Sequence, residues 1–316
     1  MLLGAAACAD GTAPPAPVQS PLLNVDQGPE SSAEPTHILP LRGAPETGRD
    51  LAALALPMIY HGGPVLLTPK VQAVYWSTKT IFAGGPLPGT IGPGTADGSL
   101  VGYFTRNIGV SSYFNINTTY YNAQNQHVPR QVTYTSYWAA KKNAPVVGQK
   151  VTSAQMKNQL IYGFTNGKIT YDPGTVYVIF TDSRVNLGGG FGSSYCAYHG
   201  TFNWNGQKII YAAMPYQADF VSRCATLAGG SPNNDLAGDA EIDSWAHELE
   251  ESVTDPLLNA WYDAAGNENA DKCVTHYGTL YTTPNGAKAN MVIGTKNFMV
   301  QGNWLNTATQ GCAITF

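Results

Sequence analysis

Four of the five cysteines lie in the last two fifths of the chain, where they limit how that part can fold. They are Cys196, Cys224, Cys273 and Cys312. An even number confined to one region predicts two disulfides, and three pairings are possible. Sequential pairing would close loops of 28 and 39 residues, by subtraction of the residue numbers, each stabilising the fold by roughly 3–4 kcal/mol. A zinc site of four thiolates is the competing interpretation, but the lack of a Cys-x-x-Cys pair argues against it.

The start of the chain also indicates export. Residues 1–7 are apolar and then small, and Cys8 follows them. A lipoprotein signal peptidase accepts small residues before a cysteine, which then carries the lipid; an ordinary Ala-x-Ala cleavage remnant is the alternative. The longest apolar run, residues 51–60, is too short to span a bilayer. We therefore expect an extracellular or cell-envelope protein that meets a membrane only through an N-terminal lipid.

Composition divides the chain into a signal remnant at 1–8, a tether at 9–55 and a folded domain at 56–316. Residues 9–55 are rich in Pro, Ala, Gly, Ser and Glu and poor in aromatics, which predicts a disordered segment. The net charge is -4, with 17 Lys+Arg against 21 Asp+Glu. Without a basic surplus to neutralise phosphates, a nucleic-acid partner is excluded.

The folded part predicts a single α/β domain with a mixed β-sheet and packed helices, in a zincin-like layout. Residues 175–181 are apolar throughout, so we expect them to form a central strand and not an edge strand. The remaining expected strands are 71–76, 118–122, 131–138, 194–199 and 208–214, and the expected helices are 99–108, 152–164 and 239–253.

The helix at 239–253 carries the residues with the clearest chemistry. Its apolar side chains form one stripe, while His247 and Glu251, four residues apart, lie together on the other side. A histidine and a carboxylate at this spacing can hold a divalent ion, and Glu248 can then deprotonate a metal-bound water. These are the mechanics of a His-Glu-x-x-His metallohydrolase helix, here with a glutamate as second ligand. The structural alternative is a solvent-exposed polar face of an amphipathic helix.

A third metal ligand must come from another segment. Residues 261–273 predict a hairpin; if 268–273 is extended, Glu268 and Asp271 point to opposite faces and only one can bind. Asp263, Asn267 and Asp271 could instead form a calcium loop, although the EF-hand spacing is missing. His199, three residues after Cys196, is a candidate proton donor.

Six segments occur in an order that resembles the EXORDIUM, or phosphate-induced protein 1, family. They are His-Gly-Gly-Pro-Val-Leu (61–66), Tyr-Cys-Ala-Tyr-His-Gly (195–200), Ser-Pro-Asn-Asn (231–234), Ala-His-Glu-Leu-Glu-Glu-Ser-Val-Thr-Asp-Pro (246–256), Glu-x-x-x-x-Cys (268–273) and Gly-Cys (311–312). The resemblance implies a secreted protein, because plant members are exported to the cell wall and bacteria have secreted relatives. The family helix His-Glu-Leu-Ala-Glu matches His247, Glu248 and Glu251, and a family glutamate five residues before the cysteine matches Glu268. The resemblance therefore favours Glu268 over Asp271 as third ligand.

Together these observations predict a secreted or surface-tethered zinc-dependent hydrolase, a peptidase in the first instance, acting on a peptide or cell-wall substrate. His247, Glu251 and Glu268 would hold Zn²⁺, with Ca²⁺ as the alternative ion. Glu248 would be the catalytic base, and His199 and Asp271 would lie behind the ligands. The rival hypothesis is a non-catalytic extracellular module that binds cell-wall glycan or a receptor, with a structural metal or acidic cluster.

Overall fold

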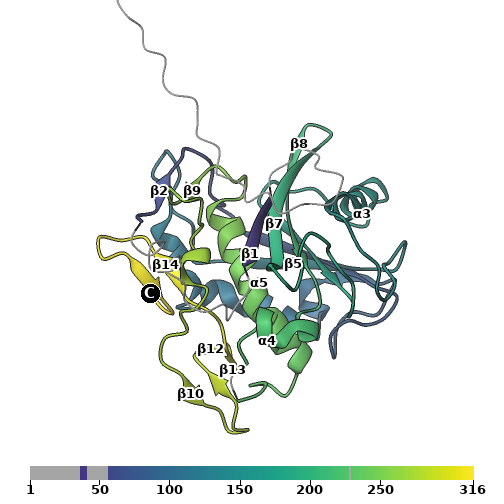
Figure 1. The fold of residues 1–316 in the computed structure, drawn as a ribbon. Coiled ribbons are helices and arrows are strands. Elements are labelled where there is room, and N and C mark those ends of the chain that lie inside the picture. Colours follow the sequence, from purple (N-terminus) through teal and green to yellow (C-terminus); the bar gives the residue numbers. More distant parts are fainter. Residues whose placement is uncertain (1–35, 41–55, 228) are drawn as a thin grey trace, which may run out of the picture.

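The computed structural model describes residues 36–40, 56–227 and 229–316, built around a seven-stranded mixed sheet (Figure 1). The strand order is β1-β7-β8-β6-β3-β5-β4. Strands β3, β5, β6 and β8 run parallel, whereas β4 and β7 are antiparallel to β5 and β8, and β1 is antiparallel to β7. The strands are β1 (Thr36–Pro40), β3 (Lys70–Trp76), β4 (Ile91–Pro93), β5 (Thr133–Ala140), β6 (Thr175–Thr181), β7 (Tyr195–Trp204) and β8 (Gln207–Met214). The predicted mixed sheet is confirmed.

Strand β6 lies in the middle of the sheet, between β3 and β8, as its apolar sequence predicts. All seven of its residues are buried. Val176 and Val178 belong to the core on one face of the sheet, and Tyr177 and Ile179 to the core on the other. A strand buried on both faces has no polar side, and this explains its continuous apolar run.

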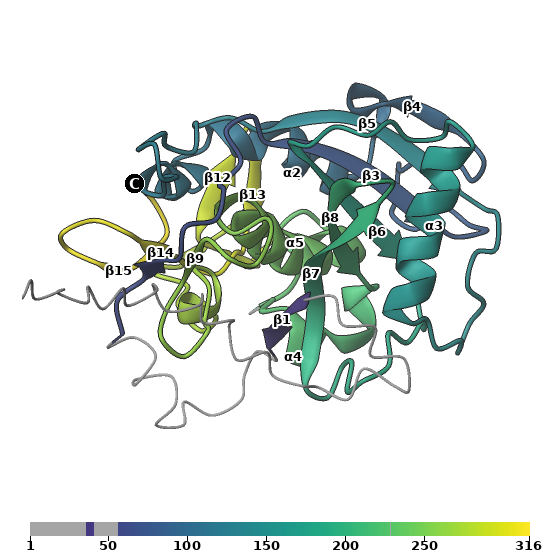
Figure 2. The same ribbon diagram turned by 90° about the horizontal axis from the view of Figure 1, so that it is seen from above.

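Helices cover both faces of the sheet. Helix α3 (Ser153–Thr165) packs on one face, and α2 (Leu100–Asn107) and α5 (Leu236–Thr254) pack on the other (Figure 2). Thr152 caps α3 in a capping box with Gln155. Helix α5 begins three residues earlier than expected, because the Asp235 side chain accepts a hydrogen bond from the Gly238 N–H and caps it there.

Short elements surround α5 and connect it to the rest of the chain. Helix α4 (Val221–Cys224) and the 3-10 helix η4 (Gln217–Phe220) precede it, and the 3-10 helix η5 (Asp271–Cys273) follows it. Two-stranded ribbons pair β2 with β9, β10 with β11, β12 with β13 and β14 with β15. Their bounds are β2 (Ile59–Tyr60), β9 (Trp261–Tyr262), β10 (Tyr281–Thr282), β11 (Lys288–Ala289), β12 (Met291–Ile293), β13 (Lys296–Phe298), β14 (Asn303–Leu305) and β15 (Gly311–Ala313).

The prediction of a strand at residues 118–122 is wrong. The segment Phe114–Thr119 is instead a 3-10 helix, η3. The hydroxyl groups of Thr118 and Thr119 donate to the backbone carbonyls of Asn115 and Ile116, three residues back. Threonine side chains that bond locally in this way compete with strand pairing.

Part of the predicted tether is also a strand. Residues Thr36–Pro40 lie inside the segment 9–55 and form β1, an edge strand beside β7. Leu39 is fully buried in the core that also holds α5. The composition of the whole segment conceals this short run of strand-forming residues. Cys8 and the rest of the signal remnant and tether lie outside the described residues.

The two predicted disulfides are present, and their pairing is sequential. Cys196 in β7 is bonded to Cys224 at the end of α4, and Cys273 in η5 is bonded to Cys312 in β15. These bonds exclude the alternative of a four-thiolate zinc site. The zincin-like layout stays a prediction. No helix in the described part of the chain has both the length and the apolar character needed to cross a bilayer.

Candidate metal centre

Helix α5 is buried on every side, so the alternative of a solvent-exposed polar face is wrong. His247, Glu248 and Glu251 are each 0% exposed. Two later segments, residues 268–273 and 301–303, cover the polar side of this helix. They do so through hydrogen bonds to Glu251, His247 and Glu250. Carboxylates are seldom buried this fully without a partner, since taking them from water is costly.

His199 lies at the centre of the acidic groups. It extends from β7 and is fully buried. Its Nδ1 lies 3.2 Å from Glu248 Oε2 and 3.5 Å from Glu251 Oε2. Its Nε2 lies 3.5 Å from Glu268 Oε2. The residue predicted from the sequence as a neighbour of the site thus contacts three of its carboxylates.

The second imidazole, His247, is held between acids on one side and an amide on the other. Its Nε2 lies 3.0 Å from Glu251 Oε1 and 3.5 Å from Asp271 Oδ1. Its Nδ1 lies 3.2 Å from the Gln301 side-chain oxygen, on the opposite edge of the ring. Gln301 Nε2 donates to the carbonyls of Ala270 and Gly302, which turns its oxygen toward the ring. In the neutral tautomer Nδ1 therefore carries the proton, and the Nε2 lone pair faces the carboxylates.

Glu251 connects the two histidines, because its Oε1 faces His247 and its Oε2 faces His199. Two groups result, His199 with Glu248 and Glu251, and His247 with Glu251 and Asp271. Within each group the candidate ligand atoms lie within 4.8 Å of one another. Zinc ligands at 2.0–2.2 Å in a tetrahedron stand about 3.4 Å apart, so the observed N–O distances are of the right size.

Glu268 and Asp271 both reach this cluster, contrary to the expectation that only one could. Residues 271–273 form the 3-10 helix η5 and not an extended strand, so the two side chains do not alternate between faces. Asp271 Oδ2 accepts a hydrogen bond from the Glu268 N–H, and the Asp271 N–H donates to Glu251. The structure places Asp271 beside His247, where Glu268 was expected, and places Glu268 against His199.

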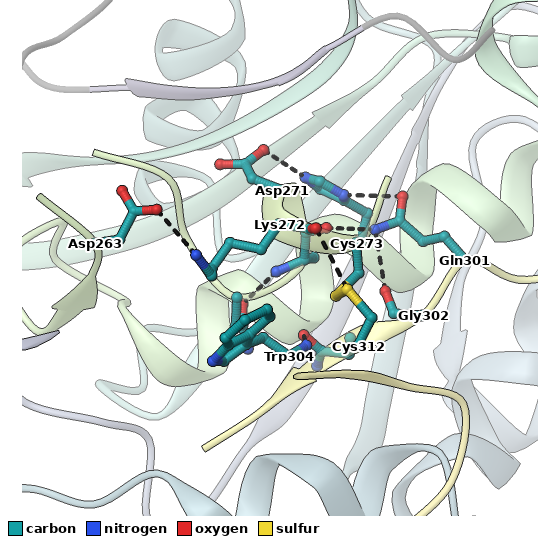
Figure 3. Close-up of a disulfide and its surroundings, with 12 residues drawn as sticks. Asp263, Asp271, Lys272, Cys273, Gln301, Gly302, Trp304 and Cys312 are labelled. Carbon is teal, nitrogen blue, oxygen red and sulfur yellow. Dashed lines mark hydrogen bonds and ion pairs between the residues drawn. A yellow bond between two sulfur atoms is a disulfide. The ribbon is translucent and has the colours of Figure 1, made fainter. Parts of the chain in front are cut away.

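The alternative calcium loop is not assembled. Asp263 accepts a hydrogen bond from Lys272 Nζ at 3.1 Å, and this ammonium lies 4.3 Å from the centre of the Trp304 ring (Figure 3). Asp263 also accepts from the backbone and side chain of Asn267. Asp263 therefore faces a cation, while Asp271 faces His247.

The electrostatics of the cluster favour positive charge. Burial lowers the pKa of both imidazoles, but the carboxylates outweigh this effect. The pKa of His199 is raised well above its ordinary value, chiefly by Glu268 and Glu248, and the pKa of His247 is raised to about 10, chiefly by Glu251. Burial raises the pKa of Glu248, against the hydrogen bond from His199.

Two residues of the site were missed from the sequence. Asp255 is buried beside Glu268, and burial together with the charge of Glu268 raises its pKa well above the ordinary value. It follows Glu251 by four residues, the same spacing that joins His247 to Glu251, so that spacing could have identified it. Gln301 is 54 residues from its partner His247, and nothing in the local sequence marks it.

Comparisons with known proteins place these residues in a family. The model described as "Phosphate-induced protein 1 conserved region" matches residues 103–291, which include every candidate ligand. Protein EXORDIUM-like 3 from Arabidopsis thaliana is 34% identical over 87 residues, covering 23% of this chain. The match covers 26% of that relative, so the chain spans about a quarter of its length. No solved structure matches. Because the family model covers more than half of the chain, this protein belongs to the phosphate-induced protein 1 family.

Proposed function

We propose that this chain is an extracellular protein that binds a divalent ion, zinc, in the cluster on α5 and uses it to hydrolyse peptide bonds. The observation that carries the proposal is the orientation of the two imidazoles. Each directs one nitrogen at carboxylates and has the other beside an acceptor, Glu268 for His199 and Gln301 for His247. Such acceptors behind a histidine fix its tautomer and orientation in metal sites. The two disulfides support an extracellular location, because they persist in oxidising compartments.

Zinc suits the donor set better than calcium. Each candidate group offers one imidazole nitrogen together with carboxylate oxygens. Calcium takes oxygen ligands, whereas zinc accepts both nitrogen and oxygen at about 2.0–2.2 Å. The proposal includes a zincin-like layout, in which the ligand-bearing helix lies against a mixed sheet. Lipid attachment at Cys8 stays a prediction.

Peptide hydrolysis is the narrower part of the proposal. His247, Glu251 and Asp271 would hold the ion, with Asp271 in place of the predicted Glu268. Glu248 would deprotonate the bound water, the role expected from its position next to His247. Its Oε1 has no hydrogen-bond partner among the described residues. The side chain of Asp271, at 7% exposed, marks the side from which a substrate would approach.

Metal analysis and a peptide-library cleavage assay on the purified chain test this proposal. We expect bound zinc in the wild type, and a turnover about 10²–10⁴-fold lower in Glu248→Gln, the usual effect of losing a general base. Glu250→Gln is the matched control, because Glu250 is equally buried on α5 but bonds Asn303 outside the cluster. A wild-type protein without divalent metal would overturn the metal centre. A metal-loaded protein that cleaves no peptide would overturn the hydrolase.

A second candidate function, a non-catalytic glycan-binding module, is favoured by a surface hollow of about 490 Å³. Tyr60 and Tyr121 line it, their ring centres 6.1 Å apart, and no charged side chain is among the residues that line it. Asn306, Thr307 and Gln310 add amide and hydroxyl groups. Aromatic rings beside neutral polar groups suit an uncharged sugar. Binding of neutral polysaccharides that Tyr121→Ala abolishes would support this candidate, and equal binding by the variant would refute it.

A further inference from the structure

We infer that the cluster is a two-ion centre, in which Glu251 bridges two divalent cations. The inference rests on the proposed metal binding and goes beyond it in the number of ions and in the role of Glu248. One ion would lie among His199, Glu248 and Glu251, and the other among His247, Glu251 and Asp271.

The geometry of Glu251 is the first argument. Its Oε1 lies 3.0 Å from His247 Nε2, and its Oε2 lies 3.5 Å from His199 Nδ1. The two oxygens therefore serve different imidazoles, one from α5 and one from β7. A carboxylate whose two oxygens face different imidazoles is placed to bridge two ions, one through each oxygen. Two-ion centres with the ions about 3.5–4 Å apart recur in hydrolytic enzymes.

The second argument is charge balance in a buried site. Glu248, Glu251, Glu268 and Asp271 have side-chain exposures of 0, 0, 2 and 7%. Together the four carboxylates carry a formal charge of −4 when ionised. A single divalent ion leaves at least one of these charges uncompensated even when the other imidazole is protonated, in a medium where an unpaired charge is costly. Two divalent ions neutralise all four carboxylates with both imidazoles neutral. Asp255, whose Oδ1 accepts from the backbone N–H groups of Asn259 and Ala260, would add a fifth negative charge only in its ionised form.

The third argument is an unused ligand position on Glu248. Its Oε2 faces His199, while its Oε1 is buried and has no hydrogen-bond partner within the described ranges. An ion beside His199 Nδ1 would give this carboxylate the partner that its burial requires. Glu268, on the Nε2 edge of the same ring, would then accept the imidazole N–H and leave Nδ1 to bind the ion.

Zinc stoichiometry of the full chain tests the inference, measured by elemental analysis and by titration with Zn²⁺ after removal of metal with a chelator. We expect two ions per chain in the wild type, one in Glu248→Gln and one in Asp271→Asn. Glu250→Gln, the same change in an equally buried position outside the cluster, should keep two. The melting temperature of each variant with chelator shows whether it is folded. If either cluster variant does not fold, the other decides the result.

The outcomes separate this inference from the proposed function. One ion in the wild type that Glu248→Gln retains would overturn the two-ion centre and leave the single-ion hydrolase standing. Two ions in the wild type and one in each cluster variant would support the bridge and assign Glu248 as a ligand and not as the base. Two ions retained by both variants would overturn the assignment of the ligands. No ion in the wild type would overturn both proposals.

Discussion

Glu248 and Glu250 lie two residues apart on α5 and are equally buried, yet their carboxyl groups have different surroundings. Glu248 faces His199. Glu250 accepts a hydrogen bond from Asn303 Nδ2 at 2.7 Å. Burial raises the pKa of Glu250 well above its ordinary value, and the hydrogen bonds from Asn117 and Asn303 offset only part of that rise. A buried carboxyl group with only amide partners is expected to hold its proton near neutral pH.

We therefore expect Glu250→Gln to increase the free energy of unfolding relative to the wild type, and to do so more at pH 7 than at pH 4. A carboxyl group whose pKa is raised by folding stabilises the folded state fully below its unfolded value, near 4.5. That contribution is lost as the pH rises toward the folded value. Glutamine can accept the same hydrogen bond and has no such loss. Urea unfolding should show the difference in free energy between variant and wild type growing by about 1.4 kcal/mol or more between pH 4 and pH 7, the equivalent of one pKa unit. An equal difference at both pH values would contradict the prediction.

Metal binding should release protons from the two imidazoles. Without a metal, the neighbouring carboxylates raise the pKa of His199 well above its ordinary value and that of His247 to about 10, which favours the protonated form of both rings at neutral pH. A ring nitrogen must lose its proton to bind zinc, so the affinity should increase with pH, by up to tenfold per unit for each proton released. Titration calorimetry in two buffers of different ionisation enthalpy measures the number of protons. A binding enthalpy that is the same in both buffers would rule this out.

At the scale of elements, the sequence predicts those whose stabilising interactions lie close by in the chain, and it misses those held by distant contacts. Helix α5 and strand β6 follow from periodicity, capping and an unbroken apolar run. The turn at η5 does not, because the Cys273–Cys312 bond and contacts with α5 hold it. The sequence therefore identified six of the acids and histidines at the site, but not that Asp271 lies beside His247 while Glu268 lies beside His199. Gln301 was missed because it joins His247 only through the tertiary fold.

Removal of the Cys273–Cys312 bond should weaken metal binding as well as the fold. This bond holds η5, which carries Asp271, against β15. We expect Cys273→Ala with Cys312→Ala to lower the free energy of unfolding by about 2–4 kcal/mol, as is typical for a disulfide. It should also lower the zinc affinity, because Asp271 is no longer held in place. Chemical unfolding and competition with a chelator of known affinity measure the two effects.

The second disulfide supplies the control. Cys196→Ala with Cys224→Ala opens a loop of 28 residues against 39, so the expected loss of stability is similar. His199 should stay in place in this variant, since β7 is paired on both sides, with β8 and with β1. An equal loss of zinc affinity in both double variants would show that η5 has no special role.

At the scale of the whole molecule, the sheet begins with a strand that the composition assigned to a tether. Strand β1 pairs with β7 from Thr36 to Pro40 and places Leu39 in the core. The strand that carries His199 is therefore an interior strand of the sheet and not its edge. A run of only five residues is too short to stand out from a segment rich in Pro and Ala.

Leu39→Ala tests whether this strand belongs to the folded unit. Truncation of a fully buried leucine costs about 2–5 kcal/mol, because a cavity remains. A residue in a disordered tether would change stability by less than about 0.5 kcal/mol. Urea unfolding of the full chain distinguishes the two results. A loss of unfolding free energy within the smaller range would show that residues 36–40 are not part of the folded unit.

The order of the central strands also has a kinetic consequence. Strand β3 pairs with β5 and with β6 in parallel, and the partners of Lys70 are Thr133 and Thr175, 63 and 105 residues later by subtraction. Neither pairing can form before a long stretch of chain has closed, and such closures slow the search for the native topology. Refolding should accordingly be slow, in milliseconds to seconds or longer. The contact between His199 and Glu248 closes a shorter stretch of 49 residues, so the two elements that carry the cluster can meet before β3 takes its place in the sheet.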